Sequence, residues 1–173
     1  GTLFAYQSED IEPDIIALAK GLGGGFPVGA VMAKAEVGDA MVPGTHGSTF
    51  GGNPLAMRSA NAVLELLLEN DFLSNLRKMI VYFDKKMDEL IKNDMQNNPI
   101  IFAKKGSGML RGFQLNEDVT AGDFSNIARE KSLLLVGAAE NTIRLLPPLN
   151  TSKEEVDNAF DILNDIVLEL KKT

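Results

Sequence analysis

The sequence predicts a mixed α/β protein built from two parts. Short apolar runs at 15–20 and 28–32 lie on either side of a glycine-rich stretch, a pattern that favours short strands or turns. After Pro54 the apolar residues recur at helical spacing. A polar stretch at 93–98 interrupts this helical pattern, and strands and helices are predicted to alternate after it. We therefore expect a first part over residues 1–94 and a compact α+β unit over residues 95–173.

Two helices are predicted after Pro54. Residues 55–68 are almost continuously apolar or small, so the first helix is expected to be buried on most sides. The second is expected to be amphipathic, because apolar residues recur at spacings of three and four. These residues are Phe72, Leu76, Met79, Ile80, Phe83, Met87, Leu90 and Ile91.

The last part is predicted to alternate strands and helices. Thr151 and Glu154 fit a capping box, which opens the final helix. Its buried face is expected to contain Val156, Phe160, Leu163, Val167 and Leu170. The elements expected before it are strands 100–103 and 109–115 joined by 104–108, helix 121–131, and strands 133–136 and 142–146.

Composition excludes several classes of function. The chain of 173 residues has 17 Lys and Arg against 24 Asp and Glu, a net charge of −7. We expect no nucleic-acid or membrane partner, because phosphate-rich surfaces attract surplus cations. Cys is absent and His46 is the single histidine, so no metal site is expected. No apolar run approaches the roughly 20 residues of a membrane span, and no secretory signal opens the chain, so a cytoplasmic protein is expected.

Lys20 is the first candidate for chemistry. It follows a short apolar run and precedes the glycine cluster 21–25. A lysine at the end of a buried element loses solvation, which favours the neutral amine that attacks carbonyl groups. The glycines would let a bulky cofactor approach the backbone. The alternative is an exposed lysine at a helix end, followed by a glycine cap. The cluster matches neither nucleotide-binding glycine motif, because no Gly-Lys-Ser/Thr follows and Phe26 replaces the third glycine of the dinucleotide fingerprint.

Ser48 and Thr49 are candidates for binding a phosphate. They lie in the small-residue loop 45–54, immediately before a predicted helix. Hydroxyls and free backbone N–H groups at a helix N-terminus suit a phosphate, although an ordinary capping segment has the same composition.

Arg144 is the third candidate. It lies in an apolar stretch before Pro147 and Pro148. Because an unpaired buried charge is costly, we expect a carboxylate partner, either from the protein or from a substrate.

Three long segments, taken together, resemble the class III (ornithine-type) aminotransferases. Residues 13–30 resemble the segment that carries the cofactor lysine, 46–56 the phosphate loop and 144–149 the C-terminal arginine motif. They occur in the family's order, and the likeness covers essentially the whole chain. The resemblance implies the C-terminal portion of a fold type I enzyme, with the end of the large domain followed by a small C-terminal α+β domain.

The resemblance also implies the cofactor and the roles of the candidates. Lys20 would hold pyridoxal 5'-phosphate covalently and then act as the base. Thr49 would bind the cofactor phosphate of the neighbouring subunit, so active sites would be shared across a homodimer, and Ser48 would touch the substrate. Arg144 would lie near the substrate entrance. The implied reaction moves an amino group from a small-molecule donor to 2-oxoglutarate.

Two alternatives remain open. The chain could belong to another enzyme with the same lysine chemistry, such as an ornithine or 4-aminobutyrate aminotransferase or a glutamate-1-semialdehyde aminomutase, or it could be a non-catalytic fragment. Family members are more than twice as long. We therefore expect four groups upstream of Gly1: the phosphate turn of the cofactor's own subunit, the ring-stacking aromatic residue, the aspartate that pairs with the pyridine nitrogen, and the arginine that binds the substrate carboxylate.

Overall fold

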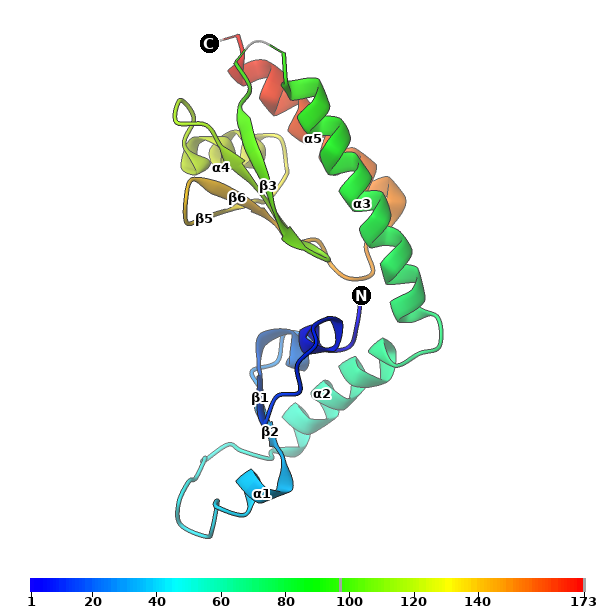
Figure 1. Cartoon of the computed structure of the whole chain (residues 1–173), viewed down its shortest axis with the longest axis vertical. Helices are drawn as coiled ribbons and strands as arrows, with labels where there is room; N and C mark the ends of the chain where they lie inside the picture. The colour runs from blue at the N-terminus through cyan, green and yellow to red at the C-terminus, as the bar shows by residue number, and fades with distance from the viewer. Residues whose placement is uncertain (97, 173) are drawn as a thin grey trace. The chain divides into compact units, whose positions relative to one another are not determined.

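The computed structural model describes residues 1–96 and 98–172, and it confirms the predicted mixture of helices and strands (Figure 1). The chain forms two compact units, one over Thr2–Ser74 and the other from Asn75 onward together with Gly1. None of the helices in the described ranges is both long and apolar enough to cross a membrane.

The N-terminal unit is built around a small antiparallel sheet and one long helix (Figure 1). Ile15 pairs with Ala33 and Leu18 with Ala30, so the glycine cluster lies in the connection between the two strands. In chain order, the elements of this unit are η1 (Ala5–Ser8), β1 (Ile15–Leu18), η2 (Lys20–Gly23), β2 (Ala30–Ala33), α1 (Ala35–Gly38) and α2 (Pro54–Leu67).

Helix α2 was expected to be buried on most sides, and this expectation is wrong for the described residues. Only the small residues Ala56 and Ala60 are buried in it, while Leu55 is 65% and Leu66 is 55% exposed. The helix packs against η2, where Ser59 donates a hydrogen bond to the Gly23 carbonyl. An apolar sequence indicates that a surface is to be covered, but not which segment or which chain covers it.

The C-terminal unit places helices against a four-stranded antiparallel sheet with the order β3-β4-β6-β5 (Figure 1). The ladder pairs Phe113 with Ile143, and both side chains are fully buried. The elements are α3 (Phe72–Asp94), which starts in the N-terminal unit, then β3 (Ile101–Ser107), β4 (Leu110–Leu115), α4 (Ala121–Glu130), β5 (Val136–Ala138), β6 (Thr142–Leu145) and α5 (Lys153–Leu170).

The core of this unit forms where alternate sheet residues meet the apolar faces of the helices. Phe83 on α3 contacts Phe160 on α5 edge to face, with ring centroids 5.3 Å apart. Met87 and Ile166 are fully buried. Truncating a fully buried aromatic such as Phe113 to alanine costs about 3–5 kcal/mol in proteins of this kind.

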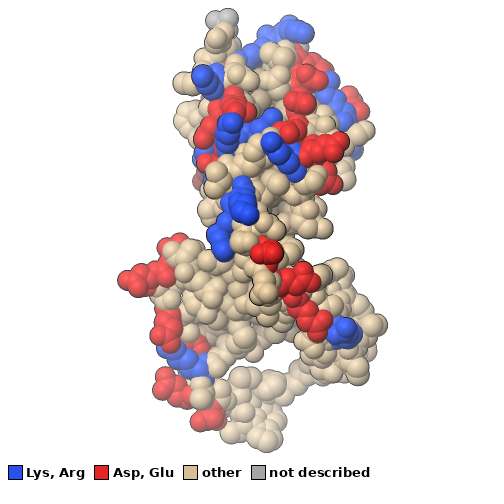
Figure 2. Space-filling view, turned by 90° about the vertical axis from the view of Figure 1, so that its right-hand side faces the viewer, with Lys and Arg blue, Asp and Glu red and all other residues tan. Residues whose placement is uncertain are grey.

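Charged side chains of both signs are interspersed on the face shown in Figure 2. Ion pairs and hydrogen bonds of charged residues join elements of the C-terminal unit. Arg111 on β4 lies 2.5 Å from Asp84 on α3. The buried Asp94 at the end of α3 accepts a hydrogen bond from the Ile101 N–H at 2.6 Å. Its other oxygen lies 2.8 Å from Lys171 Nζ, which ties α3 to the residue that follows α5.

Three of the differences between the predicted and the observed boundaries have a structural interest. Strand β3 continues through Ser107, where a linker was expected, because Gly106 pairs with Arg111 and Ser107 with Leu110. Gly106, at φ +84°, has no room for a side chain beside Leu110. The strand predicted at 133–136 is found at 136–138. The cap of α5 is Ser152, paired reciprocally with Glu155, one residue later than the predicted pair.

The boundary between the two compact units falls between Ser74 and Asn75 in the chain. They separate there because the buried side chains of α3, such as Leu76 and Phe83, all come after this point and pack in the C-terminal unit. The domain boundary expected between residues 94 and 95 is a different division from this one, and it stays a prediction.

Candidate functional site

Lys20 opens a tight turn directly after β1. Ala19 is extended, and Lys20 then adopts φ +51°, in the left-handed region. This conformation costs a residue with a Cβ atom about 1–2 kcal/mol, whereas Gly24 at φ +57° and Gly25 at φ +107° adopt it freely. A backbone hydrogen bond of 3.1 Å from Gly24 N–H to the Gly21 carbonyl closes the turn. The glycine cluster therefore provides sharp reversals of the backbone beside the lysine.

A hollow of about 650 Å³ lies beside this turn, lined by Lys20, Gly21, Gly24, Gly25, Phe26, Pro27 and Val28. Much of its wall is glycine, so a ligand here could approach the backbone closely. Lys20 itself is exposed. The expectation that it ends a buried run is wrong within this chain, since Ile15 of the same strand is 57% exposed. The described residues therefore do not desolvate the lysine amine, and any desolvation must come from a ligand or another polypeptide.

Ser48 and Thr49 lie on a turn that leads into α2. Gly51 N–H donates to the Ser48 carbonyl at 3.3 Å, and the Asn53 side chain caps α2 by accepting from Ala56 N–H at 2.9 Å. Both hydroxyl-bearing residues are exposed. Across residues 1–96 and 98–172, no hydrogen bond occupies either hydroxyl. Two free hydroxyl groups thus lie on the turn that precedes a 14-residue helix. The N-terminal end of a helix stabilises an anion.

The lysine turn and the hydroxyl turn share one support, helix α2. The hydroxyl turn precedes the first residue of the helix, and η2 packs against the helix further along. Ser59 on α2 donates a hydrogen bond from Oγ to the Gly23 carbonyl at 2.7 Å. Sequence reasoning missed Ser59 because its partner lies 36 residues away in the chain, and a lone serine within a helix carries no signal.

Arg144 lies in the C-terminal unit on β6, opposite Gly112 of β4 and Val136 of β5. Its neighbours Ile143 and Leu145 are buried, whereas Arg144 is exposed. The expectation that a buried charge must be neutralised here is wrong, because strand alternation turns every second side chain to the open face of the sheet. No carboxylate pairs with Arg144 among the residues the structure describes. A partner elsewhere stays a prediction.

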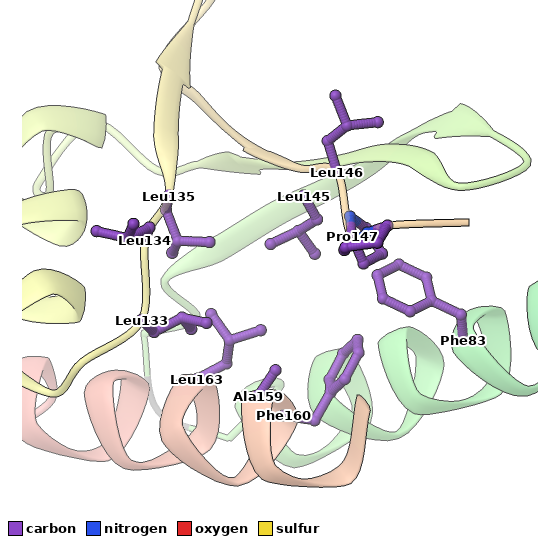
Figure 3. Close-up of a pocket in the computed structure, with 11 residues that line it drawn as sticks. Phe83, Leu133, Leu134, Leu135, Leu145, Leu146, Pro147, Ala159, Phe160 and Leu163 are labelled. Carbon is purple, nitrogen blue, oxygen red and sulfur yellow. The ribbon is translucent and has the colours of Figure 1, made fainter. Parts of the chain in front are cut away.

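The C-terminal unit also contains an apolar cavity of about 250 Å³ between α3, α5 and the segments 133–135 and 145–148 (Figure 3). Figure 3 shows side chains of leucine, phenylalanine, proline and alanine lining it. None of the lining side chains carries a titratable or hydrogen-bonding group, so this cavity is not a candidate for catalysis.

Two different turns of the N-terminal unit fit two chemical groups, a carbonyl at the lysine turn and a phosphate at the hydroxyl turn. A lysine amine can bond to a carbonyl carbon, and the glycine turn leaves room for a ring. Free hydroxyls at a helix N-terminus suit a phosphate. These are the groups that pyridoxal phosphate presents.

Comparison with known proteins gives a family match over nearly the whole chain. The sequence model of the aminotransferase class-III family matches residues 1–167. An acetylornithine aminotransferase of Oceanobacillus iheyensis is 41% identical over 170 residues, which are 98% of this chain and 41% of that protein. An acetylornithine aminotransferase of Clostridium acetobutylicum is 43% identical over 169 residues, 96% of this chain and 42% of that protein.

Solved structures of aminotransferases also superimpose on this chain. The acetylornithine aminotransferase of Elizabethkingia anophelis superimposes with a TM-score of 0.86 at 34% identity, covering 97% of this chain and 42% of that one. The ornithine δ-aminotransferase of Plasmodium falciparum gives a TM-score of 0.89 at 29% identity, covering 99% of this chain and 43% of that one. The chain spans about two fifths of the length of the relatives it matches.

Proposed function

Because the chain belongs to the class-III aminotransferases, we propose that it carries the lysine-bearing part of an enzyme that transfers an amino group from N-acetylornithine to 2-oxoglutarate, with pyridoxal 5'-phosphate as cofactor. This reaction would serve arginine biosynthesis. The observation that carries the proposal is the position of Lys20, exposed on a glycine turn beside an open hollow.

The proposed roles follow from the chemistry of each side chain. The Nζ atom of Lys20 would bind the cofactor and, once displaced by the donor amine, would move a proton at the donor carbon. Pyridoxal phosphate, when bound, supplies the electron sink that this proton transfer requires. Thr49 would donate a hydrogen bond to the cofactor phosphate of a neighbouring subunit. Ser48 beside it would contact the substrate.

A homodimer with shared active sites is part of this proposal. Its support is the exposed apolar surface around the hydroxyl turn, where Phe50 is 81% and Leu55 is 65% exposed. An aromatic residue and a leucine left uncovered beside a functional turn are typical of a surface that another subunit covers. The substrates are small soluble metabolites, so we place the reaction in the cytoplasm.

The choice of donor rests on sequence similarity. The acetylornithine aminotransferases of Oceanobacillus iheyensis and Clostridium acetobutylicum are 41% and 43% identical to the chain. That of Elizabethkingia anophelis is 34% identical, whereas the ornithine aminotransferase of Plasmodium falciparum is 29% identical. That protein nevertheless superimposes with the higher TM-score, so ornithine is the second candidate donor.

Donor competition with the full gene product that carries this chain tests the proposal. N-acetylornithine, N-succinyldiaminopimelate, ornithine and 4-aminobutyrate would each be offered with 2-oxoglutarate, and glutamate formation would be measured. We expect the highest kcat/KM for N-acetylornithine, with activity on N-succinyldiaminopimelate as the analogous reaction of lysine biosynthesis. A higher kcat/KM for ornithine or 4-aminobutyrate would overturn the donor assignment, and no glutamate from any donor would overturn the reaction.

A further inference from the structure

The backbone of Lys20 adopts a conformation that its own type disfavours. Its φ of +51° lies in the left-handed region, where a Cβ atom crowds the backbone. Such a conformation persists only when surrounding contacts hold it. The contacts that hold this turn therefore determine where the lysine amine is presented.

Most hydrogen bonds of the turn are local. Leu22 N–H donates to Ala19 at 3.2 Å, and Gly24 N–H donates to Gly21 at 3.1 Å. Local bonds of this kind shape a turn but do not fix it to the rest of the unit. Ser59 attaches the turn to α2, because its hydroxyl donates a hydrogen bond to the Gly23 carbonyl at 2.7 Å from a position 36 residues away.

The residues around the hydrogen bond from Ser59 to Gly23 are closely packed. Gly23 is buried, and a Cβ atom added to it would lie 2.7 Å from Val28 Cγ1. A Cβ atom on Gly24 would lie 2.9 Å from Val63 Cγ2, one turn of α2 after Ser59. The glycine turn therefore packs against Val63 of α2 at Gly24 and against Val28 of its own loop at Gly23. The Ser59 hydrogen bond reaches Gly23 beside these two contacts.

We propose that Ser59 is a positioning residue for Lys20. Its hydroxyl holds the Gly23 carbonyl on α2 and thereby holds the left-handed turn in which Lys20 presents its amine. The role rests on the proposed function, since the amine matters only if Lys20 binds the cofactor. Ser59 contacts neither cofactor nor substrate in this account and acts through the backbone of the turn.

Three variants of the full gene product test this role. Ser59→Ala removes the hydroxyl, and alanine favours a helix, so α2 is expected to form. Ser59→Thr retains a hydroxyl at the same position. Ser74→Ala is the matched control, because Ser74 also donates to a carbonyl, that of Asp71 at 2.9 Å, away from the lysine turn. The measurements are the rate at which added pyridoxal phosphate develops its lysine-bound visible band, the steady-state parameters and the melting temperature.

We expect Ser59→Ala to slow development of the visible band and to lower kcat by about three- to tenfold, the range for one lost hydrogen bond. KM for both substrates should change by less than about twofold, because binding groups are untouched. Ser59→Thr should restore the rates, and Ser74→Ala should leave them unchanged. Melting temperatures of the two alanine variants should fall by similar amounts.

Two results overturn the assignment of Ser59. One is a Ser59→Ala enzyme that melts earlier but develops its visible band at the normal rate, because the hydrogen bond is then only structural. The other is a Ser59→Thr enzyme as slow as Ser59→Ala, because the hydroxyl is then irrelevant. A wild-type protein that develops no visible band would instead contradict the proposed function itself, so the two failures are distinguishable.

Discussion

Tyr82 on α3 donates a hydrogen bond to the carboxylate of Asp157 on α5. Lys86 lies 3.0 Å from the same carboxylate, and Lys153 lies 4.8 Å from the centroid of the Tyr82 ring. This cluster joins the two long helices of the C-terminal unit. The hydrogen bond from Tyr82, followed by that from Lys86, lowers the pKa of Asp157. The bond to Asp157, followed by partial burial, raises the pKa of Tyr82 to about 12.

This cluster predicts how the stability of the unit depends on pH. Because the pKa of Tyr82 is raised from 10.0, its contribution is complete below pH 10.0 and is lost as the pH rises through about 12. The pKa of Asp157 is lowered, so its contribution is present above its ordinary 3.8 and is lost as the pH falls through the lowered value. Spectroscopic titration of tyrosinate should show a late transition that Tyr82→Phe removes. Tyr6→Phe is the control and should retain it. A late transition that survives Tyr82→Phe would contradict the assignment.

Asn141→Ala should destabilise the C-terminal unit. The Asn141 side chain accepts from Ala121 N–H at 2.8 Å and donates to the Asn116 and Val119 carbonyls, each at 2.8 Å. Losing three such bonds costs roughly 2–4 kcal/mol at about 1 kcal/mol each. Amide hydrogen exchange in α4 and β6 would report the loss. Because Asn141 has φ +49°, Asn141→Gly should be about 1 kcal/mol less damaging than Asn141→Ala. Equal protection in the wild type and both variants would contradict this account.

Thr49→Val should weaken retention of the cofactor. A hydrogen bond to a charged group is worth roughly 1.5–3 kcal/mol, which is about a tenfold to hundredfold change in affinity. A mixed dimer tests the proposed sharing between subunits, with Thr49→Val in one subunit and Lys20→Ala in the other. The subunit that retains Lys20 would be served by the intact Thr49 of its partner and should bind cofactor normally. Binding as weak as in the Thr49→Val homodimer would show that the contact is made within one chain.

Arg144→Lys should raise KM more than it lowers stability. Arg144 is exposed on the open face of the sheet, so the change should alter the free energy of unfolding by less than about 0.5 kcal/mol. Lysine retains the charge but loses the planar fork that binds a carboxylate through two hydrogen bonds. We expect KM for 2-oxoglutarate or the donor to rise about three- to tenfold. Arg129→Lys, on the exposed surface of α4, is the control. A normal KM for both substrates would end this interpretation.

Helices and strands were predictable from the sequence where this chain itself contains both the apolar face and the residues that bury it. The apolar face of α3 was found from its spacing, since Leu76, Phe83 and Met87 are all buried. The cap of α5 was displaced by one residue, because Thr151 and Ser152 are both good caps and both precede a glutamate at the required spacing. Local patterns therefore give the type of an element more reliably than its ends.

The environment of the candidate site was harder to predict. The burial of Lys20 was inferred from the apolar run before it, but that run is half of a two-stranded sheet that the described residues leave largely exposed. Arg144 was expected to be buried for the same reason, and strand alternation places it outside. Ser59 gave no signal, because only the folded chain brings it to Gly23. Contacts between residues far apart in the chain set these environments.

The most direct test of the central claim is to locate the covalent bond between cofactor and protein. The full gene product would be incubated with pyridoxal phosphate, reduced with borohydride and digested, and the modified residue would be identified by mass spectrometry. Our account predicts a reduced adduct on Lys20, loss of the visible band on reduction, and neither adduct nor activity in a Lys20→Ala enzyme of unchanged fold. An adduct on another lysine would contradict this account. So would a Lys20→Ala enzyme whose activity stays within about tenfold of wild type, which is a loss of less than about 1.4 kcal/mol in transition-state stabilisation.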